Sequence, residues 1–154
     1  MPINGKPAAP TRVLYTATVT ADGGRDGRAR SDDGALDVRL TPPREMGGNG
    51  DPGTNPEQLF AAGYAGCFGS AVAAVARRRR IEPGRVAITA RVGIGPLDGG
   101  AFGLTVELTA ELPDVDAEMA RALLREAHAV CPYSNATRGN VPVTLHVRGA
   151  GAPV

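Results

Sequence analysis

Two cysteines carry the most reactive side chains of this 154-residue sequence, because Cys67 and Cys131 are its only thiols. The chain does not open with a basic segment followed by an apolar one, the pattern of a secretion signal, so we expect a reducing, cytoplasmic location. In that compartment a cysteine pair is more often catalytic, redox-sensing or metal-binding than a structural bridge. The alternative is that both thiols are buried and act as small apolar side chains.

Cys67 lies in the middle of a stretch, Asn55 to Arg80, that is predicted to form one long helix. Asn55 is a favourable N-cap, and Pro56 suits the first helical position, where its missing N–H would have no partner anyway. No charged residue occurs from Leu59 to Ala76, and a helix without a polar face must be covered on all sides. We therefore expect the rest of the chain to bury this helix.

Small residues dominate the same helix. Gly63, Gly66 and Gly69 recur every three residues and would let a second helix approach closely. A stretch of about 18 to 20 apolar residues can also cross a bilayer, so a membrane span is an alternative interpretation. The low content of leucine, isoleucine and phenylalanine in this stretch disfavours that alternative.

The remaining sequence carries the patterns of strands and of one further helix. One apolar stripe predicts a second helix that begins near Asp114 or Asp116 and runs into Cys131. Alternation of apolar and polar residues predicts strands at 12–21, 28–31, 36–40, 86–94, 102–110 and 141–147. The expected order, βββ-α-ββ-α-β, is that of an α+β domain whose antiparallel sheets pack around the long buried helix. We expect this domain to cover residues 11–148, with flexible tails at 1–10 and 149–154.

Two charged residues stand out by their positions. Arg25 is held in the turn sequence DGGRDG between the first two predicted strands, and Glu57 falls in the first turn of the long helix. The simpler interpretation of Arg25 is a solvated turn residue. For Glu57 it is an acidic residue that complements the helix dipole without any catalytic duty.

The composition and the absence of motifs exclude several classes of function. A net charge of +1 gives no general attraction to nucleic acid or to an anionic membrane. The sequence contains neither a GxGxxG motif after a strand nor a GxxxxGK[ST] motif, so it offers no nucleotide cofactor site. We expect no bound cofactor and no metal.

Three stretches closely resemble the organic hydroperoxide resistance (Ohr) branch of the Ohr/OsmC family: GGRDG, NPEQLFAAGYAGCF and CPYSNATRG. The similarity extends over about Arg12 to Val147, essentially the whole folded part. The resemblance implies an intertwined homodimer that acts as a thiol peroxidase on organic and lipid hydroperoxides, with a dihydrolipoyl group or lipoylated protein as external reductant. By the same resemblance Cys67 is the peroxidatic cysteine, Cys131 is the resolving cysteine, and Arg25 and Glu57 are the supporting pair.

The chemistry of these residue types is consistent with those roles. A thiol with a pKa near 8.5 is mostly protonated at neutral pH, so rapid attack on a peroxide requires a nearby positive charge, which Arg25 can supply. A carboxylate such as Glu57 matches the planar fork of an arginine. A sulfenic acid on Cys67 can then condense with Cys131. Such a bridge requires Cα atoms within about 7 Å, so the end of the second helix must pack against the middle of the first.

The side chains around Cys67, including Phe60, Tyr64 and Phe68, offer few polar partners, which predicts a partly apolar substrate. Three alternatives remain open. The first is an OsmC-branch peroxidase, and the second is a non-enzymatic module that carries a lipid or acyl group near the thiol. The third is a metal site, for which the sequence offers two sulfur and two nitrogen ligands: Cys67, His128, Cys131 and His146.

Helix geometry also predicts that two chains share each site. Glu57 and Cys67 are ten residues apart, which separates their backbones by about 15 Å along a straight helix, too far for one glutamate side chain. We therefore expect Glu57 to serve the Cys67 of a second copy in a two-fold homodimer. The two long helices would cross in antiparallel orientation at the face of Gly63, Gly66 and Gly69.

Overall fold

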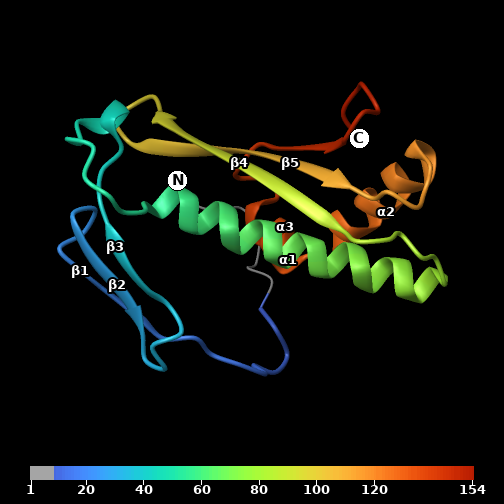
Figure 1. Cartoon of the computed structure of the whole chain (residues 1–154), viewed down its shortest axis with the longest axis horizontal. Coiled ribbons are helices and arrows are strands. Elements are labelled where there is room, and N and C mark those ends of the chain that lie inside the picture. Colours follow the sequence, from blue (N-terminus) through green and yellow to red (C-terminus); the bar gives the residue numbers. More distant parts are fainter. Residues whose placement is uncertain (1–8) are drawn as a thin grey trace. The chain divides into compact units, whose positions relative to one another are not determined.

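The computed structural model describes residues 9–154, and its chain divides into two compact units that meet in sequence between Asn55 and Pro56 (Figure 1). The expected N-terminal tail, 1–10, therefore lies almost entirely outside the described residues. The long central helix, the second sheet and both cysteines belong to the second unit, Pro56 to Val154. Each unit is described below by itself.

The first unit contains a three-stranded antiparallel sheet of β1 (Val19–Asp22), β2 (Gly27–Ser31) and β3 (Asp37–Leu40). A short 3-10 helix, η1 (Arg44–Met46), lies in the glycine- and proline-rich loop that follows. The two ends of that loop are joined, because the amide of Thr41 donates to the carbonyl of Thr54 at 2.9 Å. The three strands were predicted from sequence, and the order is confirmed.

The turn between β1 and β2 explains why its sequence is rich in glycine. Gly23 has φ 77°, and a Cβ atom built there would lie 2.7 Å from the carbonyl oxygen of Asp26. A Cβ atom on Gly27 would lie 1.8 Å from the carbonyl oxygen of Asp22. Only glycine fits both positions without moving the backbone, and this tight turn carries Arg25 between the two strands.

The first predicted strand, 12–21, is mostly wrong. Only residues 19–22 pair with β2, because β2 itself has only five residues and offers no partner to the segment before Val19. Val13, Leu14 and Tyr15 are exposed by 66%, 81% and 79%, so their apolar alternation has no covering layer in a single chain.

The second unit consists of one sheet and three helices. Its elements are α1 (Pro56–Arg79), β4 (Ala87–Pro96), β5 (Phe102–Glu111), α2 (Ala117–Val130), α3 (Pro132–Thr137) and β6 (Val143–Val147). The β4–β5 hairpin is antiparallel as predicted, and Arg91 and Glu107 are cross-strand partners joined by a 3.0 Å ion pair on its outer face. The prediction of antiparallel sheets fails for β6, which pairs with β5 in parallel. The reason is that the α2–α3 segment crosses over the sheet and returns the chain in the same direction.

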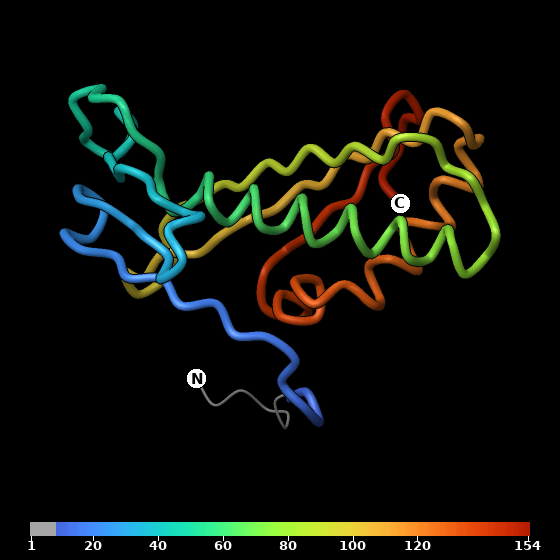
Figure 2. The backbone as a smooth tube through the Cα atoms, turned by 60° about the horizontal axis from the view of Figure 1, so that its bottom comes forward, coloured from blue at the N-terminus to red at the C-terminus, as the bar shows by residue number. Residues whose placement is uncertain are grey.

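Helix α1 agrees closely with the predicted range, and it packs against β4 on one side and against α2 and α3 on another (Figures 1 and 2). It is long and apolar enough over Pro56–Arg78 to span a membrane by length and composition, and here its buried residues form part of the hydrophobic core of the unit. It is not covered on all sides, because a stripe of small residues remains exposed along it. This stripe, termed the open face of α1, consists of Ala62, Gly66, Ser70 and Ala73.

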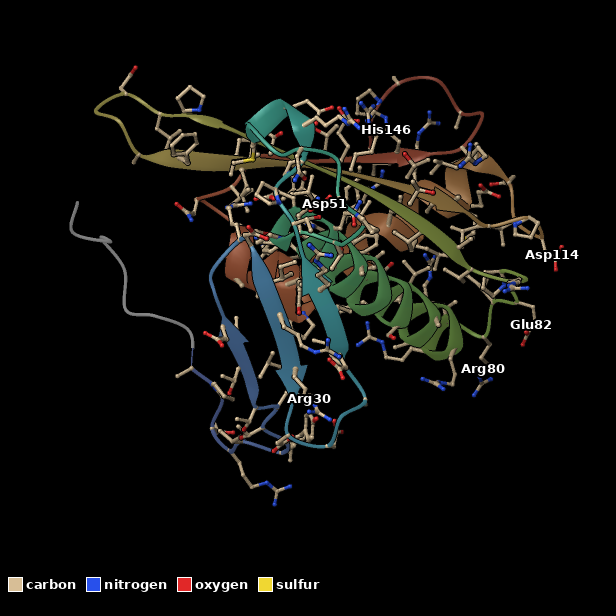
Figure 3. All side chains as sticks on the ribbon, turned by 60° about the vertical axis from the view of Figure 1, so that its left-hand side comes forward. Arg30, Asp51, Arg80, Glu82, Asp114 and His146 are labelled. Carbon is tan, nitrogen blue, oxygen red and sulfur yellow. The ribbon has the colours of Figure 1, made fainter. Side chains whose placement is uncertain are left out.

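The end of α1 is set by its arginines rather than by a glycine. Arg80 has φ 55° and donates its amide to the carbonyl of Arg77, and the amide of Ile81 donates to the carbonyl of Ala76 at 2.9 Å. This pair of bonds is the usual C-terminal closure of a helix, in which the left-handed position is more often a glycine. The side chain of Arg80 points away from the helix into solvent (Figure 3).

The three glycines of α1 do not form the single face that the sequence suggested. A Cβ atom on Gly63 would lie 2.9 Å from the hydroxyl of Tyr133 in α3, and one on Gly69 would contact Ile88 in β4. Only Gly66 faces open space. The reason is that residues three apart on a helix are rotated by about 60° from each other, so the three positions spread over about a third of its circumference.

Helix α2 begins as predicted, with the side chain of Asp116 accepting the amide of Met119 at 2.8 Å. The apolar period of its sequence, Met119, Leu123, Ala127 and Val130, only partly matches the buried face, since Val130 at the end of the helix is 43% exposed. The buried residues of the helix are Ala120, Leu123, Leu124 and Ala127. Helix α3 was not predicted at all, because its six polar and small residues carry no apolar period.

Residues 149–154, expected as a flexible tail, are hydrogen-bonded to other elements of the second unit. The amide of Val154 donates to the carbonyl of Leu145 in β6 at 2.9 Å, and the amide of Ala150 donates to that of Val147. The guanidinium of Arg121 in α2 also donates to the carbonyl of Ala150.

Candidate active site

The two cysteines lie side by side in the second unit, although they are far apart in the sequence. The Sγ atom of Cys131 lies 3.6 Å from the Sγ atom of Cys67, and neither is in a disulfide. Cys67 comes from the middle of α1, and Cys131 occupies the junction between the end of α2 and the start of α3. The predicted packing of the second helix end against the middle of the first is therefore confirmed.

The backbone at Cys131 is extended, with φ −66° and ψ 125°, which breaks the helical path between α2 and α3. Pro132 then begins α3, where its missing N–H has no cost. Because the chain bends at this residue, the thiol of Cys131 turns toward α1 while its backbone remains anchored by the bond from its amide to the carbonyl of Ala127. Cys131 is fully buried, and Cys67 is partly exposed.

The surroundings of Cys67 favour a protonated thiol. Burial raises its pKa above the ordinary value, a backbone hydrogen bond from the amide of Tyr133 lowers it, and the neighbouring Cys131 raises it again. The net direction is upward. A thiol of this kind needs an added positive charge before it is a thiolate at neutral pH.

A cavity of about 610 Å³ opens beside Cys67. Its wall is formed by α1 and by the α2–α3 junction, and the residues that line it besides Cys67 are Ser70, Ala71, Ala74, Arg77, Arg78, Val130 and Pro132. Arg77 and Arg78 are ten and eleven residues from Cys67, which corresponds to about 15 Å along the helix, too far to pair with the sulfur. The cavity next to the thiol is therefore mainly apolar, with basic groups at its far end.

The three aromatic residues that were predicted to bind substrate form one cluster with Tyr133. Tyr64 stacks edge-on against Phe60 and Phe68, with ring centroids 6.1 and 6.5 Å apart, and its centroid lies 5.6 Å from that of Tyr133. Tyr64 and Phe68 have no exposed surface, so their evident role is packing. Substrate contact by these residues stays a prediction.

A network of largely buried polar side chains joins α1, α2 and α3, and it was not predicted from the sequence. The hydroxyl of Tyr64 lies 3.0 Å from that of Ser134 and 3.2 Å from that of Thr137. The Nδ1 atom of His128 lies 2.9 Å from the hydroxyl of Ser134. The sequence does show hydroxyl residues shortly after Cys131. Because an exposed loop often contains the same residue types, their presence alone does not predict a buried network.

The supporting pair falls in different units of the chain. Arg25 lies in the β1–β2 turn of the first unit, and Glu57 is the second residue of α1 in the second unit. Helix α1 is continuous from Pro56 to Arg79, so Glu57 and Cys67 are separated by about 15 Å, as predicted from the sequence. Their catalytic roles stay predictions.

Within residues 9–154, no three side chains of His, Cys, Asp or Glu gather in an arrangement suited to a metal ion. Cys67 and Cys131 are adjacent, and His128 contacts Ser134. His146 lies on β6 (Figure 3). The four ligands of the metal alternative therefore do not form one group.

An α+β fold in which a long core helix and a helix junction bring two free thiols together defines a protein equipped for cysteine redox chemistry. The model of the OsmC-like protein family matches residues 47–146. With the similarities described next, this match shows that the chain belongs to the OsmC-like family, in its organic hydroperoxide resistance branch.

Three relatives illustrate the similarity. An organic hydroperoxide resistance protein of Xanthomonas axonopodis pv. citri is 58% identical over 139 residues, which cover 90% of this chain and 97% of the relative. The crystal structure of an organic hydroperoxide resistance protein from Elizabethkingia anophelis has a TM-score of 0.85 at 50% identity, covering 89% of this chain and 98% of the other. That of the organic hydroperoxide resistance protein OhrB of Bacillus subtilis has a TM-score of 0.83 at 47% identity, covering 88% of this chain and 100% of the other.

Proposed function

We propose that this protein is a cytoplasmic, cysteine-based peroxidase that reduces organic and lipid hydroperoxides to alcohols. Cys67 is the peroxidatic cysteine and Cys131 is the resolving cysteine. The observation that carries the proposal is the distance of 3.6 Å between the two sulfur atoms, on a fold shared with organic hydroperoxide resistance proteins. The partial exposure of Cys67 and the complete burial of Cys131 support the division of roles, because the substrate must reach the first thiol.

In the first step the thiolate of Cys67 attacks the terminal oxygen of the hydroperoxide. A sulfur–oxygen bond forms, the oxygen–oxygen bond breaks, and the alkoxide leaves as the alcohol after taking one proton. Cys67 becomes a sulfenic acid and is oxidised by two electrons. The apolar cavity beside Cys67 is suited to the organic part of such a substrate, which hydrogen peroxide lacks.

In the second step the sulfur of Cys131 attacks the Cys67 sulfenic acid. A disulfide forms, the sulfur–oxygen bond breaks, and hydroxide leaves as water with the proton of the Cys131 thiol. An external dithiol of the dihydrolipoyl type then reduces the disulfide by thiol exchange. The cycle needs no bound cofactor.

Arg25, with Glu57 as its carboxylate partner, supplies the positive charge that Cys67 requires. The upward direction of the Cys67 pKa supports this part of the proposal, because a thiol that is buried beside another thiol is poorly nucleophilic without such a charge. The calculated separation of about 15 Å along α1 supports a Glu57 that acts on the Cys67 of a second chain.

The homodimer that follows is supported by two apolar surfaces that a single chain leaves exposed. One is the open face of α1, and the other is the stretch of Val13, Leu14 and Tyr15 in the first unit. Exposed apolar surfaces of this kind mark sites of association. The open face has small residues at a helical spacing, which allow another helix to approach closely.

Peroxide consumption tests the function. With dihydrolipoamide as reductant, the protein should consume a bulky alkyl or fatty-acid hydroperoxide with a higher kcat/KM than hydrogen peroxide. Glutathione and other monothiols should support much slower turnover. Equal kcat/KM values for the two classes of peroxide would contradict the predicted substrate, and equal rates with all thiols would contradict the predicted reductant.

A further inference from the structure

The proposed reaction leaves one partly buried histidine, His128, unused, and this residue lies close in sequence to the resolving cysteine. His128 is three residues before Cys131, and Ser134 is three residues after it. The Nδ1 atom of His128 and the hydroxyl of Ser134 are 2.9 Å apart, so one hydrogen bond joins the last turn of α2 to the first turn of α3. Cys131 lies at the bend between the two helices that this hydrogen bond connects.

The bond is the first of a continuous series that ends at a carbonyl group. From Ser134 the series continues to the hydroxyl of Tyr64 in α1, at 3.0 Å, and from there to the hydroxyl of Thr137, at 3.2 Å. Thr137 lies 2.9 Å from the carbonyl oxygen of Tyr133. Ser134 and Tyr64 are fully buried and Thr137 is 4% exposed, so water does not compete at these three groups.

The carbonyl fixes the direction of every bond in the series. A carbonyl oxygen only accepts, so the hydroxyl of Thr137 must donate its single proton to a backbone carbonyl, that of Tyr133 or, at 3.2 Å, that of Ser134. Thr137 can then only accept from Tyr64, and by the same count Tyr64 accepts from Ser134. Ser134 has therefore no proton left for His128, and the Nδ1 atom of His128 must carry the hydrogen.

The imidazole is neutral at neutral pH, because burial and then the charge of Arg138 lower the pKa of His128. Its tautomer is therefore defined, with the hydrogen on Nδ1 and none on Nε2. Arg138 adds a second link across the same bend, since its guanidinium donates to the carbonyl of His128 at 2.6 Å. Two hydrogen bonds of His128, one from its side chain and one to its carbonyl, therefore connect α2 to α3 across the bend.

We propose that His128, Ser134 and Tyr64 are positioning residues that hold the α2–α3 junction in place, so that the thiol of Cys131 can attack the Cys67 sulfenic acid. The proposal rests on the proposed function. To form a disulfide, the two sulfur atoms must approach from 3.6 Å to about 2.05 Å, a shift of about 1.5 Å. A junction that is fixed near this geometry raises the rate of disulfide formation, because the two sulfur atoms are already close to bonding distance. A misplacement of about 1 Å can slow a reaction of this kind by about 100-fold.

The test compares the two chemical steps in single-turnover experiments with an organic hydroperoxide. The first step is followed by loss of the Cys67 thiol, and the second by formation of the disulfide with dimedone as a trap for sulfenic acid. In His128→Leu and Ser134→Ala, the second step should slow by about 10- to 100-fold, while the first changes much less. The dimedone adduct and the sulfinic acid of Cys67 should accumulate.

Conservative variants separate positioning from general stability. In His128→Asn, the side-chain amide keeps a donor near the place of Nδ1, so the rate of disulfide formation should recover. His146→Leu removes a histidine outside the network and should leave both steps unchanged. If Ser134→Ala fails to fold, the two His128 variants decide. An equal loss of rate in both steps, or no recovery in His128→Asn, would overturn the proposal.

Two measurements do not depend on peroxidase activity. Diamide couples two thiols without peroxide, so the disulfide should form more slowly in His128→Leu than in the wild type even if the protein does not reduce hydroperoxides. A wild type that reacts with diamide but not with peroxide would refute the proposed function alone. Long-range ¹H–¹⁵N spectra should show His128 protonated at Nδ1, and protonation at Nε2 would overturn the hydrogen-bond direction and the proposal with it.

Discussion

The sulfur atoms of Cys67 and Cys131 lie 3.6 Å apart across 64 positions of sequence, one on the middle of a helix and the other at the bend between two helices. Both are free thiols, but only a small movement of the bend separates them from bonding distance. The arrangement predicts that oxidation is confined to one chain.

One equivalent of an organic hydroperoxide should therefore produce an intramolecular Cys67–Cys131 disulfide. The reason is that the neighbouring thiol is present at a high effective concentration, whereas a thiol of another molecule is not. Peptide mapping by mass spectrometry under non-reducing conditions will identify the link. Detection of only intermolecular disulfides would contradict the scheme.

Replacement of each cysteine should affect peroxidase activity in a different way. Cys67→Ser should abolish turnover of organic hydroperoxides, because the attacking atom is lost. Cys131→Ser should still consume about one equivalent of hydroperoxide, after which Cys67 remains a sulfenic acid and is over-oxidised by excess peroxide. Steady-state assays and intact-mass measurements distinguish the two. If Cys67→Ser keeps most of its activity and Cys131→Ser loses it, the roles are reversed.

The dependence of the first step on pH should reveal the duty of Arg25. Because burial raises the pKa of Cys67, a site without a compensating charge contains little thiolate at pH 7, and its rate should rise with pH until that raised pKa is passed. Arg25→Ala should therefore react at least about 10-fold more slowly than the wild type at pH 7, and the difference should shrink as pH rises.

Stopped-flow measurements between about pH 6 and pH 10 will give both profiles. Arg25→Lys keeps the charge but loses the planar fork, so its rate should fall between those of the wild type and Arg25→Ala. Identical pH profiles for the wild type and Arg25→Ala would show that Arg25 has no effect on the Cys67 thiol and is only a turn residue.

A mixed dimer will show whether two chains share each site. A chain with Glu57→Ala is paired with a chain with Cys67→Ser, so that in a shared arrangement the surviving Cys67 faces an intact Glu57. One site should then keep near-normal turnover, about half that of the wild-type dimer per dimer. If each site is contained in one chain, the mixed dimer has no complete site and should turn over no faster than the Glu57→Ala homodimer.

The features that local sequence determines were predictable. The range of α1, the β4–β5 hairpin and the cap at Asp116 follow from capping residues, apolar period and turn composition. The approach of the two thiols was also predicted, because the peroxidatic and resolving roles that the family resemblance implies require Cα atoms within about 7 Å.

The features that were missed depend on tertiary contacts. Helix α3 is short and polar, and the buried hydroxyl groups of Ser134 and Thr137 find partners in Tyr64 and His128 of other helices as well as within α3. The parallel direction of β6 depends on the path of the crossover, which strand periodicity does not contain. The apolar alternation before Val19 is real, but whether it forms a strand depends on a pairing partner that one chain does not provide.

The separation of 64 positions between the cysteines also couples the redox state to the folding equilibrium. A crosslink that closes a loop of this size removes enough entropy from the unfolded chain to stabilise the fold by about 4 kcal/mol. The same free energy makes the disulfide harder to reduce in the folded protein than in the unfolded chain, by about 90 mV for a two-electron couple. In the proposed catalytic cycle, a covalently crosslinked protein would therefore alternate with a less stable one, and the reductant would have to be a dithiol of low reduction potential.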